Sequence, residues 1–417
     1  MCGIAGWIDY NRDLKVFEDT INKMTGTLVH RGPDAQGIYL KENVCLMHRR
    51  LIVIDPENGA QPMTREKGNT SYTIVYNGEL YNTNELRDEL LSFGYHFRGH
   101  CDTEVLLTAF IHWGESCLER LNGIYAFGVW NDTSKTLFLA RDRMGVKPLF
   151  IYNYPGGIIF ASELKTLLVN PLVKPRIDND GLKEIFLLGP GRTSGNGVIK
   201  GVTELKPGEF LIFGHEQGLK IRKYWNLKAC EHTDDIKTTI EKTRFLITDA
   251  VKRQLVSDVP LCCFLSGGLD SSIISKIASE SYLSDNKGRL HTYSVNYVDN
   301  QQYFVKNIFQ PNSDEEYIQI MVKGIESQHH EVLLDNDELE KHLGDAVLAR
   351  DLPGMADVDS SLLLFCREIK KEFTVAVSGE CADEIFGGYP WYHNRDILFK
   401  DTFPWSQSLD LRQSILK

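Results

Sequence analysis

A cysteine at the second position is the first residue whose type and place could do chemistry. Removal of Met1, which a small second residue permits, would leave a free α-amine and a thiol on one residue. The α-amine has a reference pKa of about 7.7 to 8.0 and the thiol one of about 8.5, so the amine can accept the thiol proton near neutral pH. Cys2 is therefore a candidate nucleophile that needs no histidine. The alternative is a small apolar residue that opens a buried strand, which is the commoner case when position alone is considered.

A glycine-rich turn is the second candidate site, in the sequence PLCCFLSGGLDSS at residues 260–272. It joins an apolar segment to a helical pattern, and the free N–H groups and dipole at such a helix start bind anions. It does not contain the Gly-Lys-Ser/Thr sequence that grips a γ-phosphate. A capped glycine turn without a ligand is the competing interpretation, which the order of strand, paired glycines and helix disfavours. The pattern recurs in VAVSGECADEIFGGY at residues 375–389, so we expect two loops on neighbouring strands to face one crevice.

Short β-rich segments separated by turn residues run from Ile4 to about Phe213. Few helical patterns interrupt them, the clearest being Asn82 to Phe93 and Thr103 to Trp113. Such frequent strands predict an α+β domain of antiparallel sheets sandwiched by helices. We assign residues 2–214 to this domain and the polar, non-periodic residues 215–235 to a linker.

Strands and helices alternate in the remaining residues, 236–417. This alternation implies right-handed crossovers and an α/β domain with a doubly wound parallel sheet, in which ligands bind at the carboxyl ends of the strands. The expected strands are PLCCFL, LHTYSVNY, HHEVLL and TVAVS. The expected helices are Ile236 to Val256, Ser271 to Ser281, Glu315 to Ile325, Glu338 to Arg350 and Ser360 to Lys371.

Composition places the chain among ordinary globular proteins, with 417 residues, 42% hydrophobic and 25% charged. A net charge of −11 argues against nucleic acid as a partner. Nine cysteines without a CxxC pair fit neither a complete disulfide framework nor a zinc ribbon, and they favour a cytoplasmic location. No stretch approaches the roughly 18 apolar residues of a membrane span.

Five motifs follow one another in the first domain: CGIAG (2–6), HRGPD (30–34), RRLIVID (49–55), NGELYN (77–82) and CDTE (101–104). NGELYN and HRGPD alone are typical of turns, and Arg49 or Arg50 alone is typical of surface charge. As an ordered set they resemble the class II glutamine amidotransferases, whose N-terminal cysteine hydrolyses glutamine to release ammonia. The resemblance implies that Cys2 is the nucleophile.

The resemblance also implies the roles of the other residues at this site. The Asn77 amide and the Gly78 backbone N–H would stabilise the oxyanion that forms when the thiolate attacks. Arg50 would bind the α-carboxylate of glutamine, and Glu79 and Asp102 its α-ammonium. The remaining residues that the resemblance assigns to glutamine are Leu51, Ile52, Val53 and Ile54.

The sequence SGGLDS at residues 266–271 resembles the pyrophosphate loop of ATP pyrophosphatases. Together with TYSVN, the second Ser-Gly loop and the amidotransferase motifs, it resembles glutamine-hydrolysing asparagine synthetases. This implies ATP as a substrate, Mg²⁺ on Asp270 and Asp383, and Glu380 as the base that deprotonates ammonium before ammonia attacks β-aspartyl-AMP. The implied ATP-binding residues are Phe264, Leu265, Ser266, Gly267, Gly268, Asp270, Ser271, Ser272, Val295, Ser378 and Gly379.

The expected substrates are glutamine, aspartate and ATP, and a homodimer is one assembly compatible with the sequence. Family members continue with an arginine-containing VPF segment and a later lysine, neither of which follows Tyr389, so we expect a chain shortened at its C-terminus. An acceptor carboxylate other than aspartate, glutaminase activity alone, or a non-catalytic regulatory role remain alternatives. His329-His330 and Cys262-Cys263 are expected to be structural, because adjacent residues on a strand point to opposite faces.

Overall fold

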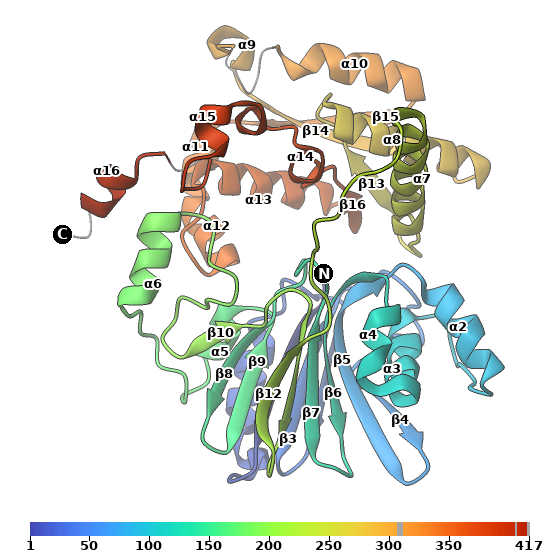
Figure 1. Cartoon of the computed structure of the whole chain (residues 1–417), viewed down its shortest axis with the longest axis vertical. Coiled ribbons are helices and arrows are strands. Elements are labelled where there is room, and N and C mark those ends of the chain that lie inside the picture. The colour runs from blue at the N-terminus through green and yellow to red at the C-terminus, as the bar shows by residue number, and fades with distance from the viewer. Residues whose placement is uncertain (307–311, 405–406, 415–417) are drawn as a thin grey trace. The chain divides into compact units, whose positions relative to one another are not determined.

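The computed structural model describes residues 1–306, 312–404 and 407–414. The chain divides into two compact units (Figure 1), residues 1–185 with 191–231 and residues 186–190 with 232–417. Among the described residues, no helix combines the length and the apolar character needed to cross a bilayer.

Two six-stranded antiparallel sheets form the first unit. The strand order of one is β10-β8-β9-β1-β3-β2 and that of the other is β12-β11-β7-β6-β5-β4. The strands of the first sheet are β1 (Gly3–Asp9), β2 (Ala35–Leu40), β3 (Val44–Arg50), β8 (Phe150–Tyr154), β9 (Gly157–Ala161) and β10 (Val202–Glu204). The strands of the second are β4 (Met63–Lys67), β5 (Thr70–Leu80), β6 (Gly123–Asn131), β7 (Thr136–Arg141), β11 (Glu209–Gly214) and β12 (Gly218–Lys223).

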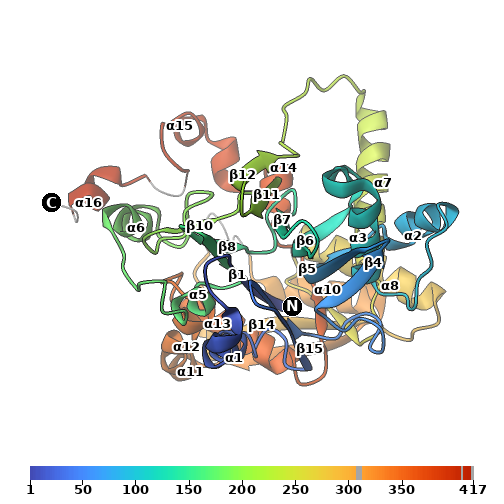
Figure 2. The same ribbon diagram turned by 90° about the horizontal axis from the view of Figure 1, so that it is seen from below.

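Alternation along the strands builds two hydrophobic layers in this unit. On β5, Val75 packs with Ile4 and Trp130 in one cluster, while its neighbours Ile74 and Tyr76 pack in a second cluster with the helices outside. Figure 2 shows α1 and α3 on the outer sides of the strands. The helices of the unit are α1 (Glu18–Gly26), α2 (Thr83–Ser92), α3 (Asp102–Trp113), α4 (Cys117–Arg120), α5 (Leu164–Leu168) and α6 (Asn179–Lys183), with 3₁₀ turns at Leu14–Phe17 and Gly114–Ser116.

A parallel sheet of order β15-β14-β13-β16 forms the second unit. Its strands are β13 (Leu261–Phe264), β14 (His291–Tyr297), β15 (Gln328–Leu334) and β16 (Val375–Val377). The longer helices are α7 (Ile236–Gln254), α8 (Leu269–Ser284), α10 (Asp314–Ile325), α12 (Leu343–Arg350) and α13 (Asp357–Ile369). The short ones are α9 (Asn300–Tyr303), α11 (Asn336–Lys341), α14 (Ala382–Phe386), α15 (Arg395–Leu398) and α16 (Leu409–Ser414), with a π-helical turn at Glu184–Leu188 and a 3₁₀ turn at Pro390–His393.

Helices cover both faces of this sheet. The buried Cys262 side chain packs in a cluster with Phe365 of α13, whereas that of the adjacent Cys263 packs in another with Val251 of α7 and Ala278 of α8. The two neighbouring thiols therefore lie on opposite faces, as expected for a strand. The predicted fold classes of both units are confirmed.

The structure differs from the sequence-based expectation in two places. Residues 215–235 were expected to be an irregular linker, but β12 lies inside this range and pairs with β11 through the hairpin between Gly214 and Gly218. Its GLKIRK sequence is polar because it is the edge strand of its sheet, and such strands carry exposed charges. The helix expected over residues 338–350 is divided at His342 into α11 and α12.

Candidate active sites

Cys2 directly precedes β1, and the pairing of Gly3 with Arg49 brings it to the end of β3. The backbone N–H of Leu51 donates to Cys2 Sγ at 3.4 Å, and the Nε–H of Arg31 donates to the Cys2 carbonyl oxygen at 2.9 Å. Burial raises the pKa of the Cys2 thiol, and the Leu51 N–H and the chain's amino terminus act in the opposite direction. The thiol is thus held in place but needs a base to become a nucleophile.

Asn77 and Gly78 lie inside β5, not in a turn, and pair with Ala126 and Tyr125 of β6. A Cβ atom on residue 78 would lie 2.4 Å from the carbonyl oxygen of Ile124, so only glycine fits. Asn77 is 1% exposed, and its Nδ2 has no hydrogen-bond partner among the described residues. A buried amide donor left unpaired costs stability, which is a feature of sites built to bind a ligand.

The half-buried Glu79 and the buried Asp102 form a pair of acids. Burial and the neighbouring Asp102 raise the pKa of Glu79 to about 8. Burial also raises the pKa of Asp102, against the hydroxyl of Tyr76 and the N–H of Leu80, which donate to its Oδ2 at 2.8 and 3.2 Å. Two neighbouring acids whose pKa values are both raised favour a cationic guest, such as an ammonium group.

Arg50 is buried and organises the loop that follows it. Its guanidinium donates to the carbonyl oxygens of Ile54, Asp55 and Pro56 at 3.1, 2.6 and 3.0 Å. Three of its five N–H groups are therefore engaged within the protein. The loop contains the half-buried residues Leu51, Ile52, Val53 and Ile54, which the sequence assigned to glutamine.

Residues that sequence reasoning did not single out support this site. Arg31 bonds Glu163 at 3.0 Å, and Lys165 and His30 bond the same carboxylate at 2.9 and 3.0 Å. Burial opposes the charge of Glu163, but these partners hold its pKa at about 2. The only signal for Arg31 was its place in HRGPD, whereas Glu163 follows β9 with no motif to mark it. Arg141 and Lys147 are further buried cations that no motif indicated.

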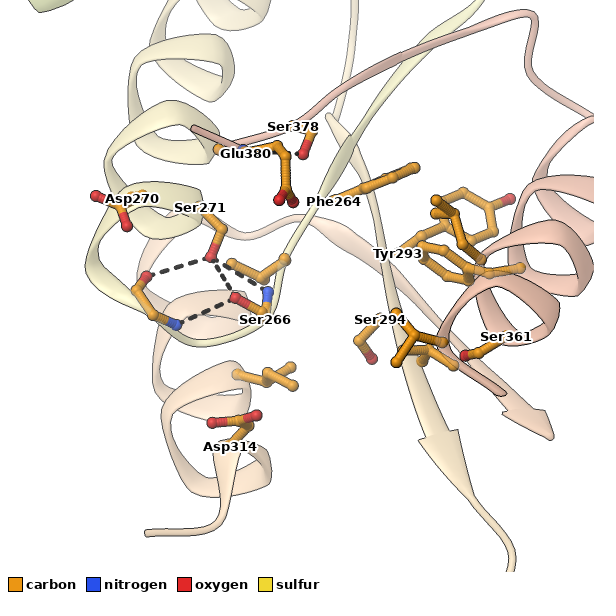
Figure 3. A pocket seen from close by; sticks show the side chains of 18 of the residues that line it. Phe264, Ser266, Asp270, Ser271, Tyr293, Ser294, Asp314, Ser361, Ser378 and Glu380 are labelled. Atoms are coloured by element: carbon orange, nitrogen blue, oxygen red, sulfur yellow. Dashed lines mark hydrogen bonds between the residues drawn. The ribbon is translucent and has the colours of Figure 1, made fainter. Parts of the chain in front are cut away.

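The second site is a cavity of about 1000 Å³ at the carboxyl ends of the parallel strands (Figure 3). Gly267 and Ser272 belong to its loop but do not line it. Gly267 has a φ of +81°, and a Cβ atom there would lie 2.8 Å from the Asp314 carbonyl oxygen, while Ser272 N–H donates to Gly268 O at 3.1 Å in the first turn of α8. The predicted residues that do line the cavity are Phe264, Leu265, Ser266, Gly268, Asp270, Ser271, Val295, Ser378, Gly379, Glu380 and Asp383.

Hydroxyl groups shape the loop between β13 and α8. The Ser266 and Ser271 oxygens lie 3.0 Å apart, and Gly268 N–H donates to Ser266 Oγ at 3.4 Å (Figure 3). Helix α8 has 16 residues, so its N-terminus carries the full helix dipole toward the cavity. Such a loop and helix start can bind phosphate oxygens.

Gly379 allows the loop after β16 to pack against the loop between β13 and α8. A Cβ atom on residue 379 would lie 3.0 Å from Asp270 Cβ and 3.1 Å from Ser271 N. Burial and the nearby Asp270 raise the pKa of Asp383. Two carboxylates that repel each other beside a phosphate loop fit a hard divalent cation such as Mg²⁺, which takes one or two carboxylates together with phosphate oxygens and water.

Other residues line the same cavity without having been predicted. The hydroxyls of Tyr297 and Ser361 lie 2.7 Å apart across it. The ring centroids of Phe264 and Phe365 are 4.8 Å apart with the rings tilted by 57°, so the two rings pack against each other in the apolar part of the wall. Asp357 and Ser361 lie on α13, and Asp314 and Asn336 begin α10 and α11.

A His-Glu cluster lies outside both sites. His291 Nδ1 and His330 Nε2 are 3.0 Å apart, and a Glu372 oxygen lies within 4.8 Å of both. His329 instead contacts Thr292 and Ser294 at 3.0 and 3.1 Å, which confirms that His329 and His330 do not act as a pair. The His291–His330 distance is that of a hydrogen bond when one of the two facing nitrogens carries a proton.

Both units match known protein families. The glutamine amidotransferase domain family matches residues 1–225, and the asparagine synthase family matches residues 242–417. Glutamine-hydrolysing asparagine synthetase 3 of Bacillus subtilis (strain 168) is 50% identical over 416 residues, which cover 100% of this chain and 67% of that protein. The chain belongs to the glutamine-hydrolysing asparagine synthetase family.

Asparagine synthetase 1 of Bacillus subtilis (strain 168), another glutamine-hydrolysing member, is 35% identical over 401 residues, covering 94% of this chain and 59% of that protein. The chain therefore spans 59–67% of the lengths of these two relatives. A solved structure of the allosteric regulatory enzyme of purine biosynthesis aligns over 80% of each chain with a TM-score of 0.41 and 16% identity, which supports no conclusion about activity. The predicted family is confirmed.

Proposed function

We propose that this member of the asparagine synthetase family hydrolyses glutamine at Cys2 and uses the ammonia to convert aspartate into asparagine with ATP. The observation that carries the proposal is the buried Asn77 amide, whose Nδ2 has no hydrogen-bond partner among the described residues, in the same unit as a fixed thiol and the paired acids Glu79 and Asp102. These are the groups that an amide hydrolase needs for an oxyanion, a nucleophile and a substrate ammonium.

In the first step the α-amine of Cys2 takes the thiol proton, and the thiolate attacks the carboxamide carbon of glutamine. The Asn77 amide and the Gly78 N–H donate to the oxyanion that forms. Collapse of this intermediate breaks the C–N bond, and ammonia leaves with the proton returned by the amine. Water then hydrolyses the thioester to glutamate. Glu79 and Asp102 bind the ammonium group of the substrate. Arg50 binds the α-carboxylate of the substrate and also holds the shape of the loop that follows β3.

In the second step a carboxylate oxygen of aspartate attacks the α-phosphorus of ATP, and pyrophosphate leaves. Ser266, Gly268 and Ser271 bind the phosphate oxygens through N–H and O–H donors. Asp270 and Asp383 would hold Mg²⁺, which offsets the charge of those oxygens when bound. Glu380 accepts a proton from ammonium, ammonia attacks the acyl carbon, and AMP leaves.

The experiment follows the amide nitrogen and the nucleotide together. The chain is incubated with glutamine labelled with ¹⁵N in its side-chain amide, aspartate, ATP and Mg²⁺, and the products are identified by mass spectrometry. We expect labelled asparagine, glutamate, AMP and pyrophosphate in equal amounts. ADP in place of AMP would refute the adenylation step, and glutamate without any amidated product would restrict the function to a glutaminase. A labelled amide of a different acid, formed when candidate carboxylates are supplied, would identify another acceptor.

A further inference from the structure

Lys147 is held in place by an elaborate turn after β7. The Asp142 carboxylate accepts from the N–H groups of Met144, Val146 and Lys147 at 3.1, 3.0 and 3.0 Å. The guanidinium of Arg141 donates to the Lys147 carbonyl oxygen at 2.7 Å. The buried side chains of Asp142 and Arg141 thus fix the backbone of Lys147. Lys147 is itself a buried charged residue, only 5% exposed. A surface lysine needs no such support.

The ammonium group of Lys147 lies at the amino terminus of the chain. Its Nζ is 2.9 Å from Sδ of Met1, the residue directly before Cys2. A thioether is a weak acceptor and does not account for a buried ammonium. Burial lowers the pKa of Lys147, Glu79, Asp142 and Cys2 raise it, and the cation of Arg31 lowers it. Apart from Asp142 of the turn, the groups that act on the charge of Lys147 therefore belong to the proposed glutaminase site or support it.

We propose that Lys147 is a positioning residue of this site: once Met1 is removed, its ammonium favours the unprotonated form of the Cys2 α-amine, which is the base, and the ionised form of Glu79, which receives the substrate ammonium. The inference rests on the proposed glutaminase function. It adds a residue and an electrostatic role that the motifs do not indicate.

Both effects have the same sign. A neighbouring positive charge disfavours protonation of the α-amine, and it favours ionisation of Glu79, whose pKa burial raises to about 8. Each effect moves the acidic limb of activity to lower pH, because the deprotonated amine and the ionised carboxylate are the active forms. The negative charges of Asp102 on α3 and Asp142 in the turn after β7 oppose this shift to lower pH. The positive charge of Arg31, in the segment after α1, supports it.

The test compares the pH dependence of kcat/KM for glutamine hydrolysis in the full chain and in Lys147→Met, a substitution of similar length that suits a buried position. Lys147→Arg restores the charge, and Lys183→Met, at an exposed lysine paired with Asp180, is the control. Intact mass establishes the state of Met1 in each protein.

We expect Lys147→Met to move the acidic limb up by about one pH unit, giving roughly a tenfold loss at neutral pH that largely disappears at pH 9. Lys147→Arg should return the limb toward the parent position, and Lys183→Met should not move it. A loss that is equal at every pH would overturn the proposal in favour of a structural role. Retention of Met1 in Lys147→Met alone would overturn it in favour of a role in processing. If Lys147→Met does not fold, Lys147→Gln serves for the same comparison. An inactive parent chain would instead refute the proposed function.

Discussion

The two candidate sites use opposite strategies for charge. The site around Cys2 relies on enclosed side chains, with Asn77 1% and Asp102 6% exposed and Cys2 and Glu79 half-buried. The site at the parallel sheet is an open cavity whose Ser266, Gly268 and Glu380 are exposed. In the first, desolvation shifts the pKa of fixed side chains. In the second, backbone N–H groups and a helix dipole await a highly charged ligand, so less of the chemistry is built into the apo protein.

Replacement of Cys2 gives the largest expected separation of the two sites. Cys2→Ala removes the nucleophile, so glutamine hydrolysis should fall at least about 10³-fold. Amidation driven by added ammonium salts should be unchanged, since that chemistry belongs to the other unit. Release of glutamate at the parent rate would show that the nucleophile is a different residue.

Asn77→Ala tests whether the buried donor is reserved for the oxyanion. We expect kcat for glutamine hydrolysis to fall by about 10² to 10³, the usual cost of losing one such donor. Thermal stability should change little, because the amide has no hydrogen-bond partner among the described residues to lose. A large drop in the melting temperature with little effect on kcat would mean that Asn77 supports the fold and not the reaction.

The open site should depend on an added cation where the buried one does not. Asp270→Asn and Asp383→Asn are each expected to weaken Mg²⁺-dependent ATP binding by about tenfold or more, measured by calorimetry at fixed Mg²⁺. Without Mg²⁺ both substitutions should leave binding unchanged or improve it, because each removes a negative charge facing phosphate. Asp285→Asn, at the other end of α8, is the control. Equal effects with and without Mg²⁺ would contradict the metal assignment.

The smallest expected effect concerns how Glu79, beside Asp102, changes the stability of the fold with pH. The pKa of Glu79 is about 8 in the folded chain against an ordinary value of 4.5, so the stability that its protonated form allows is complete below pH 4.5 and is lost as pH rises to 8. Glu79→Gln stays neutral and should raise the melting temperature of the first unit relative to the parent by about 2–4 °C at pH 8, the shift that about 1 kcal/mol produces. At pH 5 the difference should vanish. A difference that is independent of pH would show that Glu79 is ionised throughout.

Prediction from sequence worked where a local pattern dictates the structure. Cys262 and Cys263 face opposite sides of β13 because a strand alternates, and the SGGLDS segment joins that strand to α8 because paired glycines and a helical pattern follow it. Asn77-Gly78 is less local. The dipeptide alone favours a hairpin turn, and only the ordered set of motifs indicated a different role.

The linker shows where the pattern was insufficient. Residues 218–223 are polar, yet they form β12, because an edge strand needs a partner on one side only and exposes its side chains to solvent. The polarity that marks a linker in sequence is the same polarity that protects a sheet edge. Whether such a segment pairs depends on β11, which the segment itself does not specify.

The sequence by itself determined the two fold classes, the family and the order of the reactive motifs along the chain, because periodicity and turn chemistry are local. Tertiary structure alone decided which distant charges meet. Lys147 reaches Met1 across 146 positions, Arg50 turns back into its own loop, and Gly379 approaches Asp270 across more than a hundred residues. Burial and Coulomb interactions depend on separation in space and on the exclusion of water, neither of which is written in the spacing of residues along a chain.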